Sequence, residues 1–228
     1  MLDIGCGDGK ISAQLSQALE KGNVIGIDQS EEMIDLATEK FPLDQYPNLS
    51  FKHMDATNIQ FSRKFNVAFS NATLHWVRNH LVVLQGVRTC LKTGGKILIQ
   101  MGGRGNAADV FNAMQKVIQF PQWTSYFKDF TPPYYFYGPE EYQEWLTASG
   151  FDVVRVELIQ KDMQHQGVEG LLGWLRTTWF PYTNRLPAEL RDTFLEEVVA
   201  AYITMHPIDR LGNTHVNMVR LEVEASAL

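Results

Sequence analysis

The sequence predicts an α/β fold in which a mostly parallel sheet is covered by helices on both faces. Short apolar segments alternate with amphipathic stretches through the first half of the chain. Strands that alternate with helices in this way are joined by right-handed crossovers, and such crossovers produce parallel sheets. The length of 228 residues is sufficient for one domain of this kind with an appended lobe.

The first half contains the strands and helices of this predicted sheet. Residues 23–28 indicate a buried strand, because the segment is short and apolar. Ser30 is followed by two glutamates, which is typical of a helix N-cap with acids in the first turn. The other expected strands cover residues 1–4, 49–54, 65–70 and 96–101, and the expected helices cover residues 10–21, 30–40 and 80–91.

The second half has a different composition. Residues 102–106 form a glycine-rich exit from a strand, and residues 120–138 are rich in aromatic side chains and proline. Because helical segments interrupt a pair of strands, we expect a helical lid at about 167–206 that packs over the ligand end of the sheet. The expected elements are a helix at 139–149, an outer strand at 151–158, helices at 168–179 and 187–206, and a closing strand near 215–223.

The composition limits the partners of the protein. The formal net charge is -6 and no block of lysine or arginine stands out, so a nucleic-acid partner is not expected. The two cysteines, Cys6 and Cys90, give neither a disulfide framework nor a zinc motif, which indicates a reducing compartment such as the cytoplasm and no metal site. No apolar run approaches the roughly 20 residues that a membrane span requires.

The chain begins with residues that already have the pattern of a strand. Residues 1–4 run directly into a glycine-rich turn, whereas a strand of this kind normally lies in the middle of a sheet with other segments before it. We therefore expect that an upstream segment is missing from this sequence.

Three glycines, Gly5, Gly7 and Gly9, lie between the first expected strand and the helix that follows it. Glycine permits positive φ and lets the backbone approach a ligand closely, and the N-terminus of the helix offers unpaired N–H donors. Asp28 ends the second strand, where a carboxylate can accept both hydroxyls of a ribose. This combination predicts a site for a cofactor that contains adenosine.

Two details favour S-adenosylmethionine over a dinucleotide as that cofactor. The dinucleotide pattern G-x-G-x-x-G requires its third glycine at position 10, but this residue is Lys10 and the glycine lies one position earlier. Asp3, in the first strand, suits the ammonium and sulfonium charges of S-adenosylmethionine and would repel a pyrophosphate. A domain of the same type that binds another adenosine cofactor is the alternative.

These residues resemble those of class I S-adenosylmethionine-dependent methyltransferases, and the resemblance covers nearly the whole chain. Residues 3–9 (DIGCGDG), including Cys6 within the loop, match the first motif of the family, and Asp28 with Gln29 matches its ribose-binding position. The resemblance implies a Rossmann-like sheet of seven strands, mostly parallel, with an antiparallel last strand. It also implies a single domain over residues 1–228, with a cofactor-binding half at 1–101 and a substrate-side half at 102–228.

The resemblance implies further cofactor contacts. Asp55, with Ala56 and Thr57 beside it, matches the adenine site of the family, and Asn71 begins the loop that lines the methyl-transfer site. An aspartate at a strand end is also typical of a surface or N-cap residue, so a purely structural role for Asp55 is the alternative.

A narrower likeness concerns the substrate. The segments 74–77 (LHWV) and 173–177 (GWLRT) are similar to methyltransferases that esterify small carboxylic acids, such as the trans-aconitate and juvenile hormone acid enzymes. It implies that Trp76 walls the substrate pocket, that His75 orients or deprotonates the acceptor, and that Arg176 binds a substrate carboxylate. The alternatives are that His75 and Trp76 only pack, and that Arg176 is a solvated arginine stacked on indole.

The sequence therefore predicts transfer of a methyl group from S-adenosylmethionine to a small molecule, with O-methylation of a carboxylic acid as the leading hypothesis. We expect a monomer or a homodimer. Methylation of carbon or nitrogen and non-catalytic binding of S-adenosylmethionine are the alternatives, and the glycine spacing disfavours a dehydrogenase.

Overall fold

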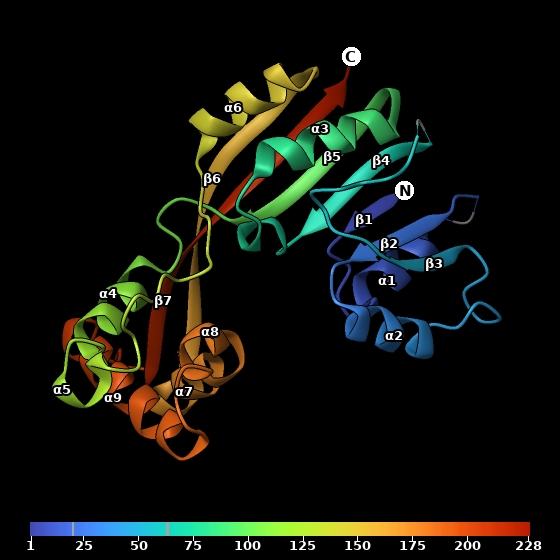
Figure 1. Cartoon of the computed structure of the whole chain (residues 1–228). Coiled ribbons are helices and arrows are strands. Elements are labelled where there is room, and N and C mark those ends of the chain that lie inside the picture. The colour runs from blue at the N-terminus through green and yellow to red at the C-terminus, as the bar shows by residue number, and fades with distance from the viewer. Residues whose placement is uncertain (20, 63) are drawn as a thin grey trace. The chain divides into compact units, whose positions relative to one another are not determined.

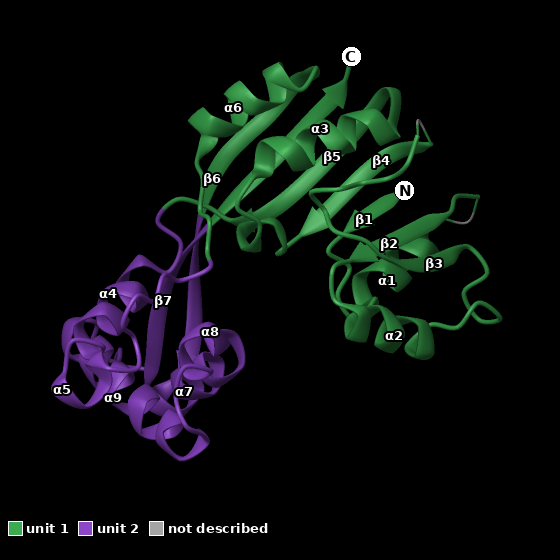
Figure 2. Cartoon of the chain, viewed as in Figure 1, with its two compact units in different colours: residues 1–104, 134–159, 220–228 green, residues 105–133, 160–219 purple. Residues whose placement is uncertain are grey.

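The structure is a computed structural model that describes residues 1–19, 21–62 and 64–228. The chain forms two compact units (Figure 1, Figure 2). Unit 1 contains residues 1–104, 134–159 and 220–228, and unit 2 contains residues 105–133 and 160–219. Glu20, which falls within the helix expected at 10–21, lies outside the described residues.

Within the described residues, seven strands form one sheet in the order β3-β2-β1-β4-β5-β7-β6. Strands β1 to β5 are parallel to one another, whereas β7 is antiparallel to β5. This topology confirms the predicted sheet, which is mostly parallel with an antiparallel last strand. The strands are β1 Leu2–Ile4, β2 Val24–Asp28, β3 Leu49–His53, β4 Phe65–Asn71, β5 Leu91–Gly102, β6 Phe151–Gln166 and β7 Asn213–Ala227.

Strand β1 is central in this sheet, between β2 and β4. All of its side chains are buried, because both faces of a parallel sheet are covered by helices. The carboxyl ends of β1, β2, β3 and β4 lie at the same edge, since these strands are parallel to one another. The loops that carry the predicted cofactor residues leave the sheet at this edge.

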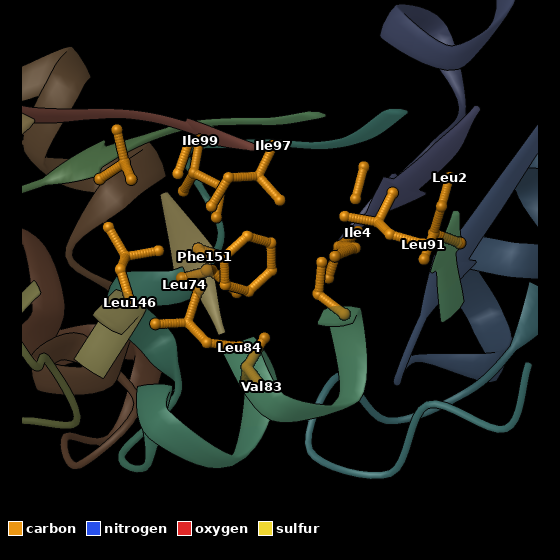
Figure 3. Close-up of a cluster of buried hydrophobic side chains, with 14 of the residues drawn as sticks. Leu2, Ile4, Leu74, Val83, Leu84, Leu91, Ile97, Ile99, Leu146 and Phe151 are labelled. Atoms are coloured by element: carbon orange, nitrogen blue, oxygen red, sulfur yellow. The ribbon is translucent and has the colours of Figure 1, made fainter. Parts of the chain in front are cut away.

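The main core of unit 1 lies between the sheet and helices α3 (His80–Cys90) and α6 (Pro139–Ala148). Figure 3 shows Leu84 of α3, Leu146 of α6 and Ile97 of β5 among the side chains that converge there. On α1 (Lys10–Ala18), Ala13 belongs to a smaller buried cluster with residues of β2 and β3. Helix α2 (Glu31–Lys40) begins as predicted, with the Ser30 hydroxyl accepting a hydrogen bond from the Met33 amide at 3.2 Å.

Unit 2 is built mainly from helices. Its longest helix buries Phe194, Val198 and Tyr202, and Trp123 packs edge-on against Phe194 with ring centroids 5.3 Å apart. Among the described residues, no helix is both long and apolar enough to cross a bilayer. The helices are α4 Ala108–Val117, α5 Pro121–Thr124, α7 Gly167–Thr178, α8 Phe180–Thr183 and α9 Arg191–Met205, and a 3₁₀ turn, η2, covers Ala188–Leu190.

Several elements of the second half differ from the sequence prediction. Helix α4 was not predicted, although its buried residues Val110, Ala113, Met114 and Val117 have the spacing of one helical face. Strands β6 and β7 extend beyond the predicted 151–158 and 215–223 and contribute residues to both units. The extension of β6 is polar and largely exposed, so it carries no apolar alternation that would have indicated a strand.

Candidate functional site

The loop between β1 and α1 is fixed against β2. Gly5, Gly7 and Gly9 have positive φ values of 72°, 52° and 79°. The amides of Gly5 and Cys6 donate to the Ile27 carbonyl at 2.8 and 3.0 Å, and Gly9 is the N-cap of α1. The loop is therefore a tight bend whose path is set by hydrogen bonds to the neighbouring strand.

The three glycines are required for different reasons. A Cβ atom on Gly5 would lie 1.9 Å from the Thr73 side chain, and one on Gly9 would lie 2.6 Å from Phe51. A Cβ atom on Gly7 would meet nothing within 4 Å. Gly5 and Gly9 therefore allow close packing, whereas Gly7 faces open space in which a ligand can approach the backbone.

Asp28 connects the glycine loop to the start of α2. Its Oδ2 atom accepts a hydrogen bond from the Gly7 amide, and its Oδ1 atom accepts one from the Ser30 amide, both at 2.9 Å. A carboxylate has about four acceptor positions, so each oxygen retains capacity for a further donor. The side chain is thus held in one orientation while it can still accept a pair of hydroxyl groups.

Asp3 is a buried carboxyl group behind this loop. It is 2% exposed, and its Oδ2 atom accepts a hydrogen bond of 2.5 Å from the Ser12 hydroxyl on α1. Burial raises the pKa of Asp3 to about 6, the Ser12 hydrogen bond opposes this shift, and the nearby Asp28 charge adds to it. Asp3 is therefore ionised at neutral pH and becomes neutral in mildly acidic solution.

The residues expected at the adenine follow β3. The Asp55 Oδ1 atom accepts from the amide and the hydroxyl of Thr57 at 2.7 and 2.9 Å, so Asp55 stabilises a local turn. Asp55 is exposed, and Ala56 and Thr57 are partly buried. The Met54 amide donates to the Asp28 carbonyl at 2.9 Å, which holds the start of this turn beside the end of β2. Gln29 follows Asp28 and is exposed.

The loop after β4 is attached to the glycine loop. Asn71 ends β4, and Ala72 adopts a positive φ of 55°. The Thr73 hydroxyl donates to the Gly5 carbonyl at 3.0 Å. The structure therefore brings the glycine loop, Asp28, Asp55 and Asn71 to one edge of the sheet in unit 1.

His75 and Trp76 lie in a 3₁₀ turn, η1 (Leu74–Trp76), within an aromatic cluster. The His75 ring lies 5.4 Å from Trp76 and 5.9 Å from Phe136, and Trp76 lies 4.7 Å from Tyr134, measured between ring centroids. Burial, and secondarily the nearby His80, lowers the pKa of His75 to about 4. His75 is therefore neutral at physiological pH and is a weak base.

Arg176 belongs to unit 2, whereas the other predicted site residues belong to unit 1. It lies in the last turn of α7, and its Nε atom donates to the Asp192 carboxylate at 2.8 Å. Its side chain is 42% exposed. Its role toward a substrate stays a prediction.

Sequence reasoning missed Ser12 and the individual role of Thr73. Each is a hydroxyl residue whose partner lies across the loop, on Asp3 and on the Gly5 carbonyl respectively. For Ser12, the sequence did offer a signal, because the helix after the glycine loop carries the small residues Ser12, Ala13 and Ser16. All three are buried in the structure. Cys6 is 8% exposed and burial raises its thiol pKa strongly, which is typical of a packed cysteine and not of a reactive thiol.

The different surroundings of Gly5 and Gly7 give a direct test of the loop. Gly5→Ala should lower the free energy of unfolding by about 2 kcal/mol or more, because a left-handed backbone and a steric clash are combined. Gly7→Ala should cost about 1 kcal/mol, since only the backbone conformation is unfavourable. Urea denaturation of both variants measures the difference, and equal losses would contradict the packing described for Gly5.

Comparisons with known proteins identify the family. A family model described as a methyltransferase domain matches residues 1–150. An uncharacterized methyltransferase of Schizosaccharomyces pombe is 34% identical over 165 residues, which are 71% of this chain and 62% of that protein.

More distant relatives carry more specific names. The trans-aconitate 2-methyltransferase of Deinococcus radiodurans is 28% identical over 202 residues, covering 86% of this chain and 75% of that enzyme. The juvenile hormone acid O-methyltransferase of Drosophila melanogaster is 24% identical over 216 residues, covering 90% of this chain and 71% of that enzyme.

A similar fold occurs in the solved structure of phosphoethanolamine N-methyltransferase 2 of Haemonchus contortus in complex with S-adenosyl-L-methionine. The TM-score is 0.57 at 20% identity, and the match covers 100% of this chain and 48% of that one. The matched family model, the relatives and the strand order of the sheet all indicate a methyltransferase domain. The chain belongs to the methyltransferase family, as a class I, S-adenosylmethionine-dependent member.

Proposed function

We propose that this protein transfers the methyl group of S-adenosylmethionine to the carboxylate oxygen of a small molecule. One observation supports the cofactor in this proposal. Two backbone amides hold the Asp28 carboxylate in place beside the open face of Gly7. The acceptor part is supported by the names of two relatives, which act on trans-aconitate and on juvenile hormone acid.

The residues at the sheet edge fit the proposed cofactor. In the proposal, Asp28 accepts the ribose hydroxyls, and the exposed Gln29 lies beside them. The open face of Gly7 admits the amino-acid portion, while the buried Asp3 carboxylate supplies negative charge near its ammonium group. Asp55, Ala56 and Thr57 border the adenine, and Asn71 lies at the end of β4 beside the methyl-transfer position.

The chemistry requires alignment more than acid–base catalysis. When bound, S-adenosylmethionine supplies a methyl group that is activated by its sulfonium, and S-adenosylhomocysteine is the leaving group. The protein residues orient the acceptor oxygen in line with the carbon–sulfur bond and exclude water. A carboxylate acceptor is already ionised at neutral pH, so it requires no base. The low pKa of His75 agrees with this role, because a neutral imidazole can orient an acceptor without removing a proton.

Asp28→Ala should weaken binding of S-adenosylhomocysteine by about 1 to 3 kcal/mol, because two ribose hydroxyls lose their acceptor. Calorimetric titration measures this change. Asp8→Ala is a matched control, since Asp8 lies in the same loop but forms an exposed ion pair with Lys40 at 2.9 Å. Equal affinity of wild type and Asp28→Ala would show that the ribose binds elsewhere.

The raised pKa of Asp3 predicts that cofactor binding depends on pH. An ammonium group favours the ionised carboxylate, so affinity should be full above about pH 7 and should fall by up to about tenfold per pH unit below pH 6. Titrations of S-adenosylhomocysteine between pH 5 and pH 8 measure this slope. Asp3→Asn should bind more weakly and remove the slope; a variant that keeps the wild-type pH dependence would refute the assignment.

The acceptor class is tested with labelled S-adenosylmethionine and a panel of small acceptors. The panel contains carboxylic acids, including trans-aconitate and an aliphatic monocarboxylic acid, together with phenols and amines. The proposal predicts base-labile methyl esters from at least one acid. Turnover of only hydroxyl or amine acceptors would contradict the acceptor class, and His75 would then be tested as the base.

A further inference from the structure

One side chain links the glycine loop to the turn that carries His75 and Trp76. Thr73 directly precedes η1, and its Oγ1 atom donates a hydrogen bond to the Gly5 carbonyl at 3.0 Å. The same side chain fills the space beside Gly5, where an added Cβ atom would lie 1.9 Å from the Thr73 methyl carbon. The methyl-transfer proposal gives Thr73 no role, although its hydroxyl and its methyl group both meet the loop at Gly5.

Thr73 also fixes the start of η1. It is the N-cap residue of this turn, and its carbonyl accepts a hydrogen bond from the Trp76 amide at 3.0 Å. Ala72, directly before it, has a left-handed backbone, and its amide donates to the Gln100 carbonyl of β5 at 2.8 Å. A residue other than glycine persists in this conformation only where its surroundings hold it. The path of the chain from β4 into η1 is therefore constrained on both sides of Thr73.

The Thr73 hydroxyl has two acceptors for one proton. Its Oγ1 atom lies 3.0 Å from the Gly5 carbonyl oxygen and 3.1 Å from the Asn71 carbonyl oxygen. Because a hydroxyl donates a single hydrogen, the two carbonyls share it. A displacement of the glycine loop moves this hydrogen toward Asn71, and a displacement after β4 moves it toward Gly5. The positions of the two segments are thus energetically linked.

Other hydrogen bonds hold η1 from different directions. The Tyr135 amide donates to the His75 carbonyl at 2.8 Å, and the Gly102 amide donates to the His75 Nδ1 atom at 3.5 Å. These contacts attach the turn to the segment before α6 and to the end of β5. Thr73 adds an attachment at the start of the turn, to the loop that follows β1.

We propose that Thr73 is a positioning residue that couples occupancy of the glycine loop to the order of η1, so that a bound cofactor also orients His75 and Trp76. This inference rests on the proposed function in one respect, the binding of the cofactor at the glycine loop. Coupling between two sites is reciprocal, so the acceptor binds better to the cofactor-loaded protein than to the empty one. The expected order of binding is therefore cofactor first and acceptor second.

A set of variants separates the hydroxyl of Thr73 from its shape. Thr73→Val replaces the hydroxyl with a methyl group of similar size, and Thr73→Ser keeps the hydroxyl and removes the methyl group. Thr73→Ala is a second variant without the hydroxyl, for use if Thr73→Val does not fold. Ser70→Ala is the matched control, because the buried Ser70 hydroxyl donates to the neighbouring Ile4 carbonyl at 2.8 Å from within β4, before the loop.

The kinetic test uses S-adenosylmethionine and whichever acceptor of the panel is turned over fastest. Thr73→Val should lower kcat by about tenfold, because a turn that is not aligned with the loop misplaces the acceptor. The KM for S-adenosylmethionine should stay close to the wild-type value, and Thr73→Ser and Ser70→Ala should retain wild-type kcat. Wild-type kcat in Thr73→Val, or an equal loss in Ser70→Ala, would overturn the proposal.

The decisive measurement needs no acceptor. Hydrogen exchange at the Trp76 amide is followed by NMR with and without S-adenosylhomocysteine. The ligand should slow this exchange by about fivefold or more in the wild type, Thr73→Ser and Ser70→Ala, and should have no such effect in Thr73→Val, which still binds it. Binding without slowing in the wild type, or full slowing in Thr73→Val, would refute the coupling.

Failure of the proposed function gives different results. If the wild type does not bind S-adenosylhomocysteine, both the cofactor assignment and the coupling are wrong. If the ligand slows exchange as expected but no carboxylic acid is methylated, the coupling is supported and only the acceptor class is wrong.

Discussion

The structure of the candidate site depends on the contact between the Asp28 carboxylate and the backbone of the glycine loop. Asp28 accepts from the Gly7 amide, while the Ile27 carbonyl beside it accepts from Gly5 and Cys6. These hydrogen bonds fix the loop after β1 to the end of β2. Because both strands are parallel and central, the position of the acid relative to the loop is determined by the register of the sheet.

Three ionisable groups, one acid and two histidines, determine the electrostatic character of the site. Asp3 keeps a negative charge at neutral pH, although burial raises its pKa to about 6. His75 and His80 are neutral, because burial lowers the pKa of each to about 4. A negative charge behind the glycine loop and neutral histidines in and after η1 suit the proposed reaction, in which the donor is cationic and already activated.

The sequence predicted the parts of the structure that follow from local pattern. The alternation of strands with helices was sufficient for a mostly parallel sheet, and the glycine spacing was sufficient for a tight loop with positive φ values. The number of strands and the antiparallel last strand followed from the resemblance to the family. Contacts between distant segments could not be predicted, because the hydrophobic periodicity of a sequence carries information only on local structure. The Thr73 hydroxyl on the Gly5 carbonyl joins residues 68 positions apart, and the hydrogen bond between the His80 ring and the Tyr142 hydroxyl joins residues 62 positions apart.

The second half was less predictable for a physical reason. The polar extension of β6 is exposed, so it lacks the apolar alternation by which a strand is recognised. Helix α4 does have a helical apolar face, but it begins with Ala107 in the left-handed region and has no side-chain cap, so its start carries no sequence signal. The ion pair of Arg176 with Asp192 could not be predicted either, because it depends on how α7 and α9 pack within unit 2.

The central claim is that the glycine loop and Asp28 together hold the nucleoside of the methyl donor. A crystal structure with S-adenosylhomocysteine tests it most directly. Both ribose hydroxyls should then lie within hydrogen-bond distance of the Asp28 carboxylate, and the amino-acid portion of the ligand should lie over Gly7. Density for the nucleoside at any other edge of the sheet, with Asp28 contacting only the Gly7 and Ser30 amides, would contradict it.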